Sequence, residues 1–139
     1  ASHRVAGDGW VMVGDAFGFI DPIYSSGVFL ALKGAEYTAD SILDAFEHAE
    51  LSAERLGQHG EEFLEGVEAM RKLVYAYYSE EFNFAEFLGQ HPDLKDDLVH
   101  LLIGNVYRKN VGRLLESMEK FCVLPAYEPF RLREATSEY

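Results

Sequence analysis

The stretch that decides the fold is Trp10–Val28, which reads Trp-Val-Met-Val-Gly-Asp-Ala-Phe-Gly-Phe-Ile-Asp-Pro-Ile-Tyr-Ser-Ser-Gly-Val. An apolar run predicts a buried strand that ends at Gly14-Asp15, Asp21-Pro22 marks a turn, and a long helical pattern opens at Gly27. A carboxylate at a strand end can accept hydrogen bonds from sugar or polyol hydroxyls. The amides of a helix start can face an anion or an electron-rich ligand edge. This stretch therefore predicts a cofactor-binding corner.

The composition limits the class of protein. Of the 139 residues, 48% are hydrophobic, so a packed domain is expected. The 24 acidic and 12 basic residues give a net charge of -12. This charge disfavours nucleic acid and anionic membrane surfaces as partners, because both require clustered Lys and Arg. No apolar run is long enough to predict a membrane span.

The cysteine and histidine pattern predicts neither a disulfide nor a metal site. Cys122 is the single cysteine, and the five histidines lack zinc-type spacing. A reducing, cytoplasmic location is the expectation. The chain begins Ala1-Ser2-His3-Arg4-Val5 without an initiator Met, which predicts a fragment of a larger protein.

The N-terminal half is expected to form a hairpin and a long helix. Residues 1–13 predict two short strands about Gly7-Asp8-Gly9, because Asp-Gly favours a hairpin turn. The helix predicted from Gly27 has a buried stripe at helical spacing: Val28, Leu32, Ala35, Ala39, Ile42 and Phe46. Gly34 within it costs about 1 kcal/mol relative to Ala. It either permits the close approach of a backbone or ligand, or is merely tolerated.

The C-terminal half is expected to be helical throughout. A second long helix runs to Tyr78 after an N-cap at Ser52, with an apolar stripe of Leu56, Phe63, Val67, Met70, Val74 and Tyr77. The aromatic residues of positions 75–87 either stack on a planar ligand or pack in a core, and we favour packing. A short helix begins at Pro92 and ends at Gly104-Asn105. A last helix begins near Val106 or Val111 and stops before Pro125, followed by an extended tail to Tyr139.

Motifs of other site classes are missing from the central stretch. It contains neither GxGxxG nor GxxxxGK[ST], so neither the dinucleotide fingerprint nor a Walker loop is predicted there. Ser25 and Ser26 lack the GxSxG context of a nucleophilic serine. Asp15 and Asp21 lie six positions apart and could form a catalytic carboxylate pair, but the roles of hydroxyl acceptor and turn former are more economical. No catalytic residue is assigned.

A resemblance to a known family rests on three segments: Gly14-Asp15-Ala16, Gly18-Phe19-Ile20-Asp21-Pro22 and Ser25-Ser26-Gly27-Val28. Together they resemble the second FAD-binding motif of the p-hydroxybenzoate-hydroxylase-like flavoproteins, and most closely that of the flavin-dependent halogenases. The resemblance implies a mainly α chain, in which a short N-terminal hairpin precedes four to five helices, cut from a larger α/β flavoprotein. Residues 1–30 would be the C-terminal edge of the FAD-binding domain, and residues 27–139 a helical C-terminal region.

The resemblance also implies roles for the residues of the corner. Asp15 would accept a hydrogen bond from the ribityl chain of FAD, with Gly14 allowing the close approach, and Asp21-Pro22 would shape the wall beside the flavin. Ser26-Gly27 would place amides near the N1/O2 side of the ring, where a helix start stabilises the negative charge of reduced flavin. In halogenases this position also holds the halide, chloride or bromide. Ser25, also a candidate helix cap, and Val28 complete the cofactor-binding set.

The implied function is that of an FAD-dependent oxidoreductase of the monooxygenase/halogenase type. Reduced flavin would react with oxygen so that a small-molecule substrate is halogenated or hydroxylated, with NAD(P)H as electron source directly or through a flavin reductase. The Gly-rich adenosine-binding motif, the Trp-x-Trp-x-Ile-Pro signature and the active-site Lys of halogenases are missing from this sequence. Tyr24 stands where tryptophan halogenases usually carry Glu, which argues against a tryptophan-type substrate. The isolated chain is therefore expected to be inactive and to bind FAD weakly or not at all.

Two alternatives stay open. The first is a geranylgeranyl-reductase-like flavin dehydrogenase, which shares the Gly14-Asp15 motif and the helical tail. The second is a helical module without activity of its own, which forms a homodimer through exposed apolar faces. Halide-dependent product formation separates halogenase from reductase, and a clean monomer in sedimentation argues against the module.

Overall fold

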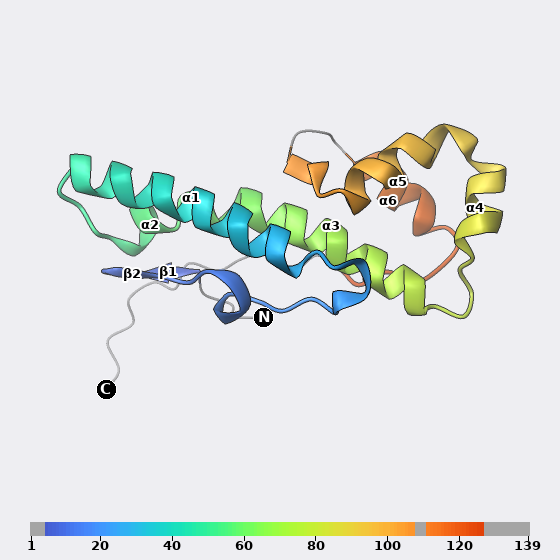
Figure 1. The fold of residues 1–139 in the computed structure, drawn as a ribbon, viewed down its shortest axis with the longest axis horizontal. Coiled ribbons are helices and arrows are strands. Elements are labelled where there is room, and N and C mark those ends of the chain that lie inside the picture. The colour runs from blue at the N-terminus through green and yellow to red at the C-terminus, as the bar shows by residue number, and fades with distance from the viewer. Residues whose placement is uncertain (1–4, 108–110, 127–139) are drawn as a thin grey trace. The chain divides into compact units, whose positions relative to one another are not determined.

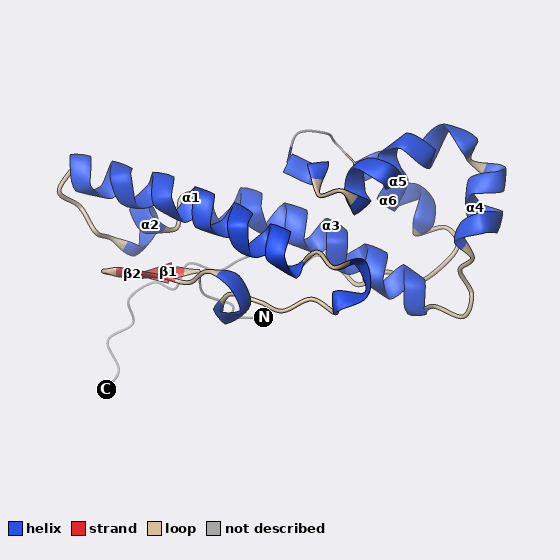
Figure 2. Cartoon of the chain, viewed as in Figure 1, coloured by secondary structure: helices blue, strands red, loops and turns tan. Residues whose placement is uncertain are grey.

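The computed structural model describes residues 5–107 and 111–126. These residues form a two-stranded antiparallel sheet followed by six α-helices, with short 3₁₀ helices between them (Figures 1 and 2). The prediction of a mainly α fold with an N-terminal hairpin is confirmed. The chain divides into two compact units. The described residues of the first are 5–19 and 27–64, and those of the second are 20–26, 65–107 and 111–126.

The hairpin of the first unit follows from its turn residues. Strand β1 (Ala6–Gly7) pairs with β2 (Trp10–Val11), and Gly9 between them has φ +78°, a conformation that glycine adopts without steric cost. The Asp8 carboxylate accepts a hydrogen bond from the Ala53 amide at 2.9 Å, which ties the turn to helix α2 (Ala53–Leu56). The hairpin prediction is confirmed for residues 5–13. Residues 1–4 lie outside the described part.

Helix α1 (Gly27–Glu47) buries a different face from the predicted one. Its buried residues are Leu30, Gly34, Ser41 and Ala45. In the predicted stripe, by contrast, the exposed fractions are 73% for Val28, 67% for Leu32 and 69% for Phe46. The buried face consists mostly of small residues, which let a neighbouring element come close. A Cβ on Gly34 would lie 3.1 Å from Cζ of Phe63, so this glycine accommodates a side chain of the same unit.

The second predicted helix is two helices. Helix α2 ends at Leu56, and helix α3 (Gly60–Tyr78) begins after a turn in which the Gly60 amide donates to the Gly57 carbonyl at 2.8 Å. Gly57 and Gly60 are weak helix formers, and they interrupt the apolar stripe. The Ser52 cap is confirmed, because the Ser52 hydroxyl accepts from the Arg55 amide at 3.3 Å. In α3 the stripe is buried from Phe63 to Val74, and Tyr77 is exposed.

The second unit is built around an apolar interior. After α3 come α4 (Phe84–Gln90), η3 (Pro92–Leu94), α5 (Lys95–Leu102), η4 (Asn105–Tyr107) and α6 (Gly112–Met118). The largest fully buried side chains of this unit are Leu73, Phe87, Leu94, Leu101, Leu114 and Met118.

The predicted boundaries in this unit hold only in part. The helix start at Pro92 and the stop at Gly104, which has φ +77°, are confirmed. Helix α4 was missed, although Asn83 caps it by accepting from the Ala85 and Glu86 amides at 2.9 and 3.1 Å. The tail predicted beyond residue 126 lies outside the described part. No helix in the two described ranges has the length and apolarity needed to cross a membrane.

Candidate functional site

The Gly14-Asp15 turn is a single turn of 3₁₀ helix, η1 (Gly14–Ala16). The amides of Phe17 and Gly18 both donate to the Gly14 carbonyl, at 3.0 and 3.2 Å, and close the turn. Gly14 has φ +58°, which residues with a side chain rarely adopt, although a Cβ there would meet only Ala31 of α1 at 3.8 Å. Glycine is therefore required by the backbone conformation. The carboxylate of Asp15 is exposed at this turn.

The start of α1 is open where a side chain of residue 27 would stand. A Cβ built on Gly27 meets no atom within 4 Å, and Val28 beside it is 73% exposed. The first amides of an α-helix have no partner within the helix and can bind an anion or an electron-rich atom. Gly14, Asp15, Gly27 and Val28 all belong to the first unit, where η1 packs on α1. The structure therefore brings these four predicted site residues together in one unit.

Asp21 is a turn former. It precedes η2 (Pro22–Tyr24), and its Oδ1 accepts one hydrogen bond from the Ile23 amide and another from the Tyr78 hydroxyl, both at 3.2 Å. Partial desolvation of the phenol, followed by the hydrogen bond to Asp21, raises the pKa of Tyr78, although the side chain as a whole is exposed. Of the two roles weighed for Asp21, these contacts favour the structural one over a catalytic carboxylate pair.

Ser25 and Ser26 lie between η2 and α1, in different roles. Ser25 closes η2, because its amide donates to the Pro22 carbonyl at 2.8 Å. Its φ of +54° is left-handed, a conformation that costs a residue with a side chain on the order of 1–3 kcal/mol. Ser26, which is 7% exposed, directly precedes α1. Ser26 is therefore the residue directly before α1, whereas Ser25 caps the C-terminal end of η2. The capping of α1 by the Ser25-Ser26 pair stays a prediction. Asp21, Pro22, Ser25 and Ser26 belong to the second unit.

Three tyrosines beside this turn were not predicted as site residues. The rings of Tyr24 and Tyr77 meet edge to face with centroids 5.9 Å apart, and those of Tyr77 and Tyr78 do so at 5.4 Å. Burial, followed by the neighbouring Tyr77, raises the pKa of Tyr24 to about 12. The density of aromatic residues in positions 75–87 was a signal, but it could not show which of them turn toward η2. Phe82 and Phe87 are buried, in agreement with the packing interpretation, whereas Tyr77 and Tyr78 are exposed.

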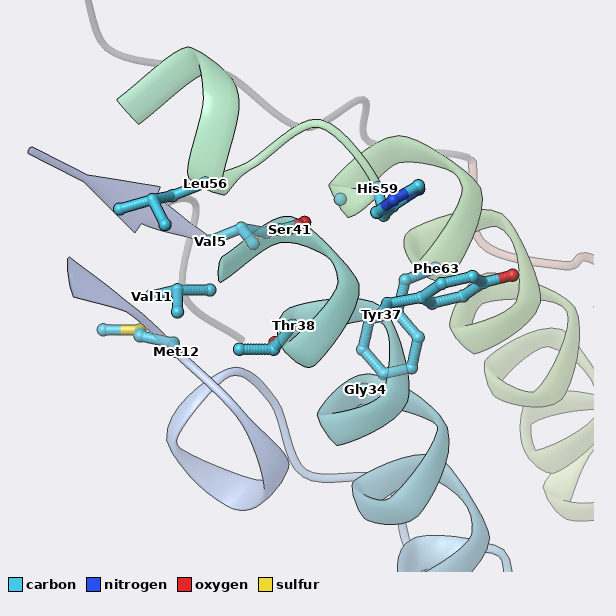
Figure 3. Close-up of a pocket in the computed structure, with 11 residues that line it drawn as sticks. Val5, Val11, Met12, Gly34, Tyr37, Thr38, Ser41, Leu56, His59 and Phe63 are labelled. Carbon is cyan, nitrogen blue, oxygen red and sulfur yellow. The ribbon is translucent and has the colours of Figure 1, made fainter. Parts of the chain in front are cut away.

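A small cavity lies elsewhere in the first unit (Figure 3). Val5, Val11 and Met12 of the hairpin face Thr38 and Ser41 of α1 around it. Its volume is about 20 Å³, room for one water molecule. None of the predicted cofactor-binding residues lines it. Within residues 5–107 and 111–126, no three His, Cys, Asp or Glu side chains gather as metal ligands would.

Comparison with known proteins identifies the class. Over most of its length this chain is homologous to flavin-dependent halogenases, so the resemblance inferred from the motif is confirmed. No protein-family model matches the chain. One of these relatives is named a flavin-dependent halogenase.

The particular relatives include two halogenases of carrier-bound pyrrole. The chain is 33% identical over 117 residues to the 1H-pyrrole-2-carbonyl-(peptidyl-carrier protein) chlorinase of Pseudomonas fluorescens, which is 84% of this chain and 25% of the relative. It is 32% identical over 106 residues to the corresponding brominase of Pseudoalteromonas luteoviolacea, or 74% of this chain and 26% of the relative. The chain thus spans about a quarter of the length of these curated relatives.

Two further relatives are relevant to the choice between a halogenase and a reductase. Flavin-dependent halogenase armH4 of Armillaria mellea is 55% identical over 42 residues, 30% of this chain and 8% of the relative. Digeranylgeranylglycerophospholipid reductase 1 of Methanosphaera stadtmanae is 26% identical over 101 residues, 68% of this chain and 25% of the relative. The similarity therefore extends from halogenases to a reductase at lower identity.

Proposed function

We propose that this chain is the C-terminal part of an FAD-dependent oxidoreductase of the monooxygenase/halogenase type, and that the whole enzyme halogenates a small-molecule substrate. The observation that carries the proposal is the pairing of the Gly14-Asp15 turn with the open start of α1 at Gly27 in one unit. This pairing occurs in a chain that is 33% identical over 117 residues to a chlorinase.

The residues of the corner suit FAD. The exposed carboxylate of Asp15 can accept a hydrogen bond from a ribityl hydroxyl, and Gly14 lets the ligand approach the backbone. The amides of Ser26 and Gly27 would face the N1/O2 side of the ring and a halide, and Gly27 itself is exposed. When bound, FAD would supply the reducing equivalents that activate oxygen. The electrons would come from NAD(P)H, directly or through a flavin reductase.

The names of the relatives guide the choice of substrate. A chlorinase and a brominase are both among them, so chloride and bromide are both candidate halides. Both names specify a pyrrole-2-carbonyl group on a peptidyl-carrier protein. We propose a small electron-rich ring as substrate, with carrier-bound pyrrole as the first to test.

The test uses the full-length protein with FAD, a flavin reductase, NADH and oxygen. Pyrrole-2-carboxylate is offered both free and on a peptidyl-carrier protein, with chloride, bromide or no halide, and products are identified by mass spectrometry. We expect a halogenated product that requires halide. Asp15→Asn should lower its formation, and the matched control Asp40→Asn, an exposed carboxylate of α1, should not. An oxygenated product formed equally without halide would contradict halogenation and indicate a monooxygenase.

A reductase is the second candidate, favoured by the 26% identity to digeranylgeranylglycerophospholipid reductase 1. Such an enzyme would saturate an isoprenoid double bond without oxygen. Anaerobic incubation of the reduced full-length protein with a geranylgeranyl lipid tests it, with loss of double bonds followed by mass spectrometry. Saturation of the lipid, together with no halogenated product in air, would replace the halogenase proposal.

The interaction module is supported by the exposed apolar side chains of α1. They are Val28, Leu32, Leu43 and Phe46, each at least 63% exposed in this chain. A face of this size in water favours association with another apolar surface. Sedimentation of the isolated chain tests this candidate. A monomer at all concentrations would exclude the homodimer, and a dimer that Leu32→Glu dissociates would support it.

A further inference from the structure

Helix α1 has two apolar faces on opposite sides. One is the buried face described above, which consists of Leu30, Gly34, Ser41 and Ala45. The other, called the outer stripe, is exposed along the whole helix and consists of Val28, Leu32, Ala35, Ala39, Leu43 and Phe46. At 3.6 residues per turn, the outer stripe spans about 80° of arc and lies roughly opposite the buried face.

Only the buried face is covered within the first unit. A Cβ on Gly34 would lie 3.1 Å from Phe63, and both η1 and α2 pack on α1. The four large side chains of the outer stripe, by contrast, are each at least 63% exposed. A helix at the surface of a domain usually turns charged or polar side chains to water on its second face. Apolar residues on two opposite sides are instead typical of a helix inside a larger body.

The matched relatives are long enough to provide such a body. The aligned part is 25% of the chlorinase and 26% of the brominase, so most of each relative lies outside it. On the proposed function, the remainder of this protein precedes Ala1. A segment of the same polypeptide acts at a high effective concentration, so it covers an apolar surface more readily than a separate partner does.

A second copy of the chain suits the outer stripe less well. By their spacing on the helix, Glu36, Asp40 and Glu47 all lie along one side of the stripe. In an antiparallel pair of α1 helices these acidic sides would face each other. Each chain also carries a net charge of -12, which adds repulsion between two copies.

We propose that the part of the full-length protein preceding Ala1 packs on the outer stripe, so that α1 lies inside the whole enzyme. This inference rests on the proposed function, since it takes the chain as the C-terminal part of a longer flavoprotein. Because η1 packs on α1, the same contact would hold the Gly14-Asp15 turn against the rest of the protein.

The test is thiol labelling of the full-length protein and of the isolated 139-residue chain. Leu32→Cys and Leu43→Cys each place a thiol on the outer stripe, and Leu30→Cys places one on the buried face as the matched control. Each protein reacts with N-ethylmaleimide over a range of protein concentrations. Mass spectrometry of the digested protein gives the rate at each position separately from that of Cys122.

Two further measurements keep the test decisive. Thermal unfolding confirms that each variant is folded. Hydroxyl-radical footprinting of the wild type follows Leu32, Leu43 and Phe46 in both proteins without any substitution, and it replaces the labelling of any variant that does not fold.

We expect labelling at positions 32 and 43 to be roughly tenfold slower, or more, in the full-length protein than in the isolated chain, because a covered thiol reacts only when the packing opens. This protection should be independent of protein concentration, and position 30 should react slowly in both proteins. Equally fast labelling at positions 32 and 43 in both proteins would overturn the inference. If a halide-dependent product still formed, the proposed function would stand.

The other occupants of the outer stripe give different results. Protection of the full-length protein that is lost on dilution would indicate a second copy. Protection that is already present in the dilute isolated chain would indicate another part of these 139 residues. Either result would overturn the inference. A full-length protein that protects both positions but forms no halogenated product would overturn the proposed reaction alone.

Discussion

The corner at residues 14–28 and the apolar interior of the second unit are held by different forces. In the corner, two positive φ values, at Gly14 and Ser25, and a few hydrogen bonds fix the backbone, and most side chains are exposed. In the interior, residues such as Leu101 and Leu114 are 0% exposed. Backbone geometry defines the first region and apolar burial the second. Substitutions should therefore separate stability from ligand binding.

The largest effect is expected in the interior. Leu101→Ala removes a fully buried side chain from α5 and should lower the free energy of unfolding by about 2–5 kcal/mol. Leu102→Ala on the same helix is the control. Because Leu102 is 39% exposed, this substitution should lower the free energy of unfolding much less. Urea unfolding of both variants measures the difference. Equal losses would show that α5 does not bury the face described.

In the corner, Gly14→Ala should have a smaller effect on stability. A side chain at φ +58° costs on the order of 1–2 kcal/mol, although the Cβ meets no close neighbour. If the turn presents Asp15 to FAD, the full-length variant should also lose flavin affinity. Urea unfolding and flavin titration are the measurements. A loss of stability with unchanged flavin affinity would separate the turn from the binding site.

A still smaller effect is expected at high pH. The pKa of Tyr24 is about 12 in the folded chain against 10.0 for an ordinary tyrosine. Between these values the unfolded chain has lost the phenolic proton and the folded chain keeps it, so this contribution to stability is complete below pH 10 and declines as pH rises toward 12. The unfolding free energy of the wild type should fall relative to that of Tyr24→Phe over this range. If the unfolding free energies of the two proteins changed with pH in the same way, the burial of Tyr24 would be contradicted.

The sequence predicted the features that depend on local residues. The Asp8-Gly9 hairpin, the Ser52 cap and the helix start at Pro92 each need only a short segment, and the structure confirms them. The corner was recognisable for the same reason, because its motif lies within Gly14–Val28. The two halogenases of carrier-bound pyrrole confirm the family that this motif indicated.

The features that depend on distant contacts were missed or predicted wrongly. The apolar stripe of α1 pointed to the wrong face, because the buried face is made of small residues such as Gly34 and Ser41 whose hydrophobicity gives no signal. The hydrogen bond between Tyr78 and Asp21 joins positions that are 57 apart, so no local sequence pattern could predict it. The roles of Asp15 and of Ser26-Gly27 toward FAD and halide stay predictions.

The most direct test of the account is the affinity of the full-length protein for FAD when Asp15 is replaced. Asp15→Ala removes a charged hydrogen-bond acceptor, worth about 1.5–3 kcal/mol, so FAD should bind roughly ten- to a hundredfold more weakly. Because the side chain is exposed, the stability of the apoprotein should stay within about 0.5 kcal/mol of the wild type. Asp40→Ala is the control, and the isolated 139-residue chain should bind no stoichiometric FAD. An Asp15→Ala protein with wild-type FAD affinity would contradict the assignment of this corner as the flavin site.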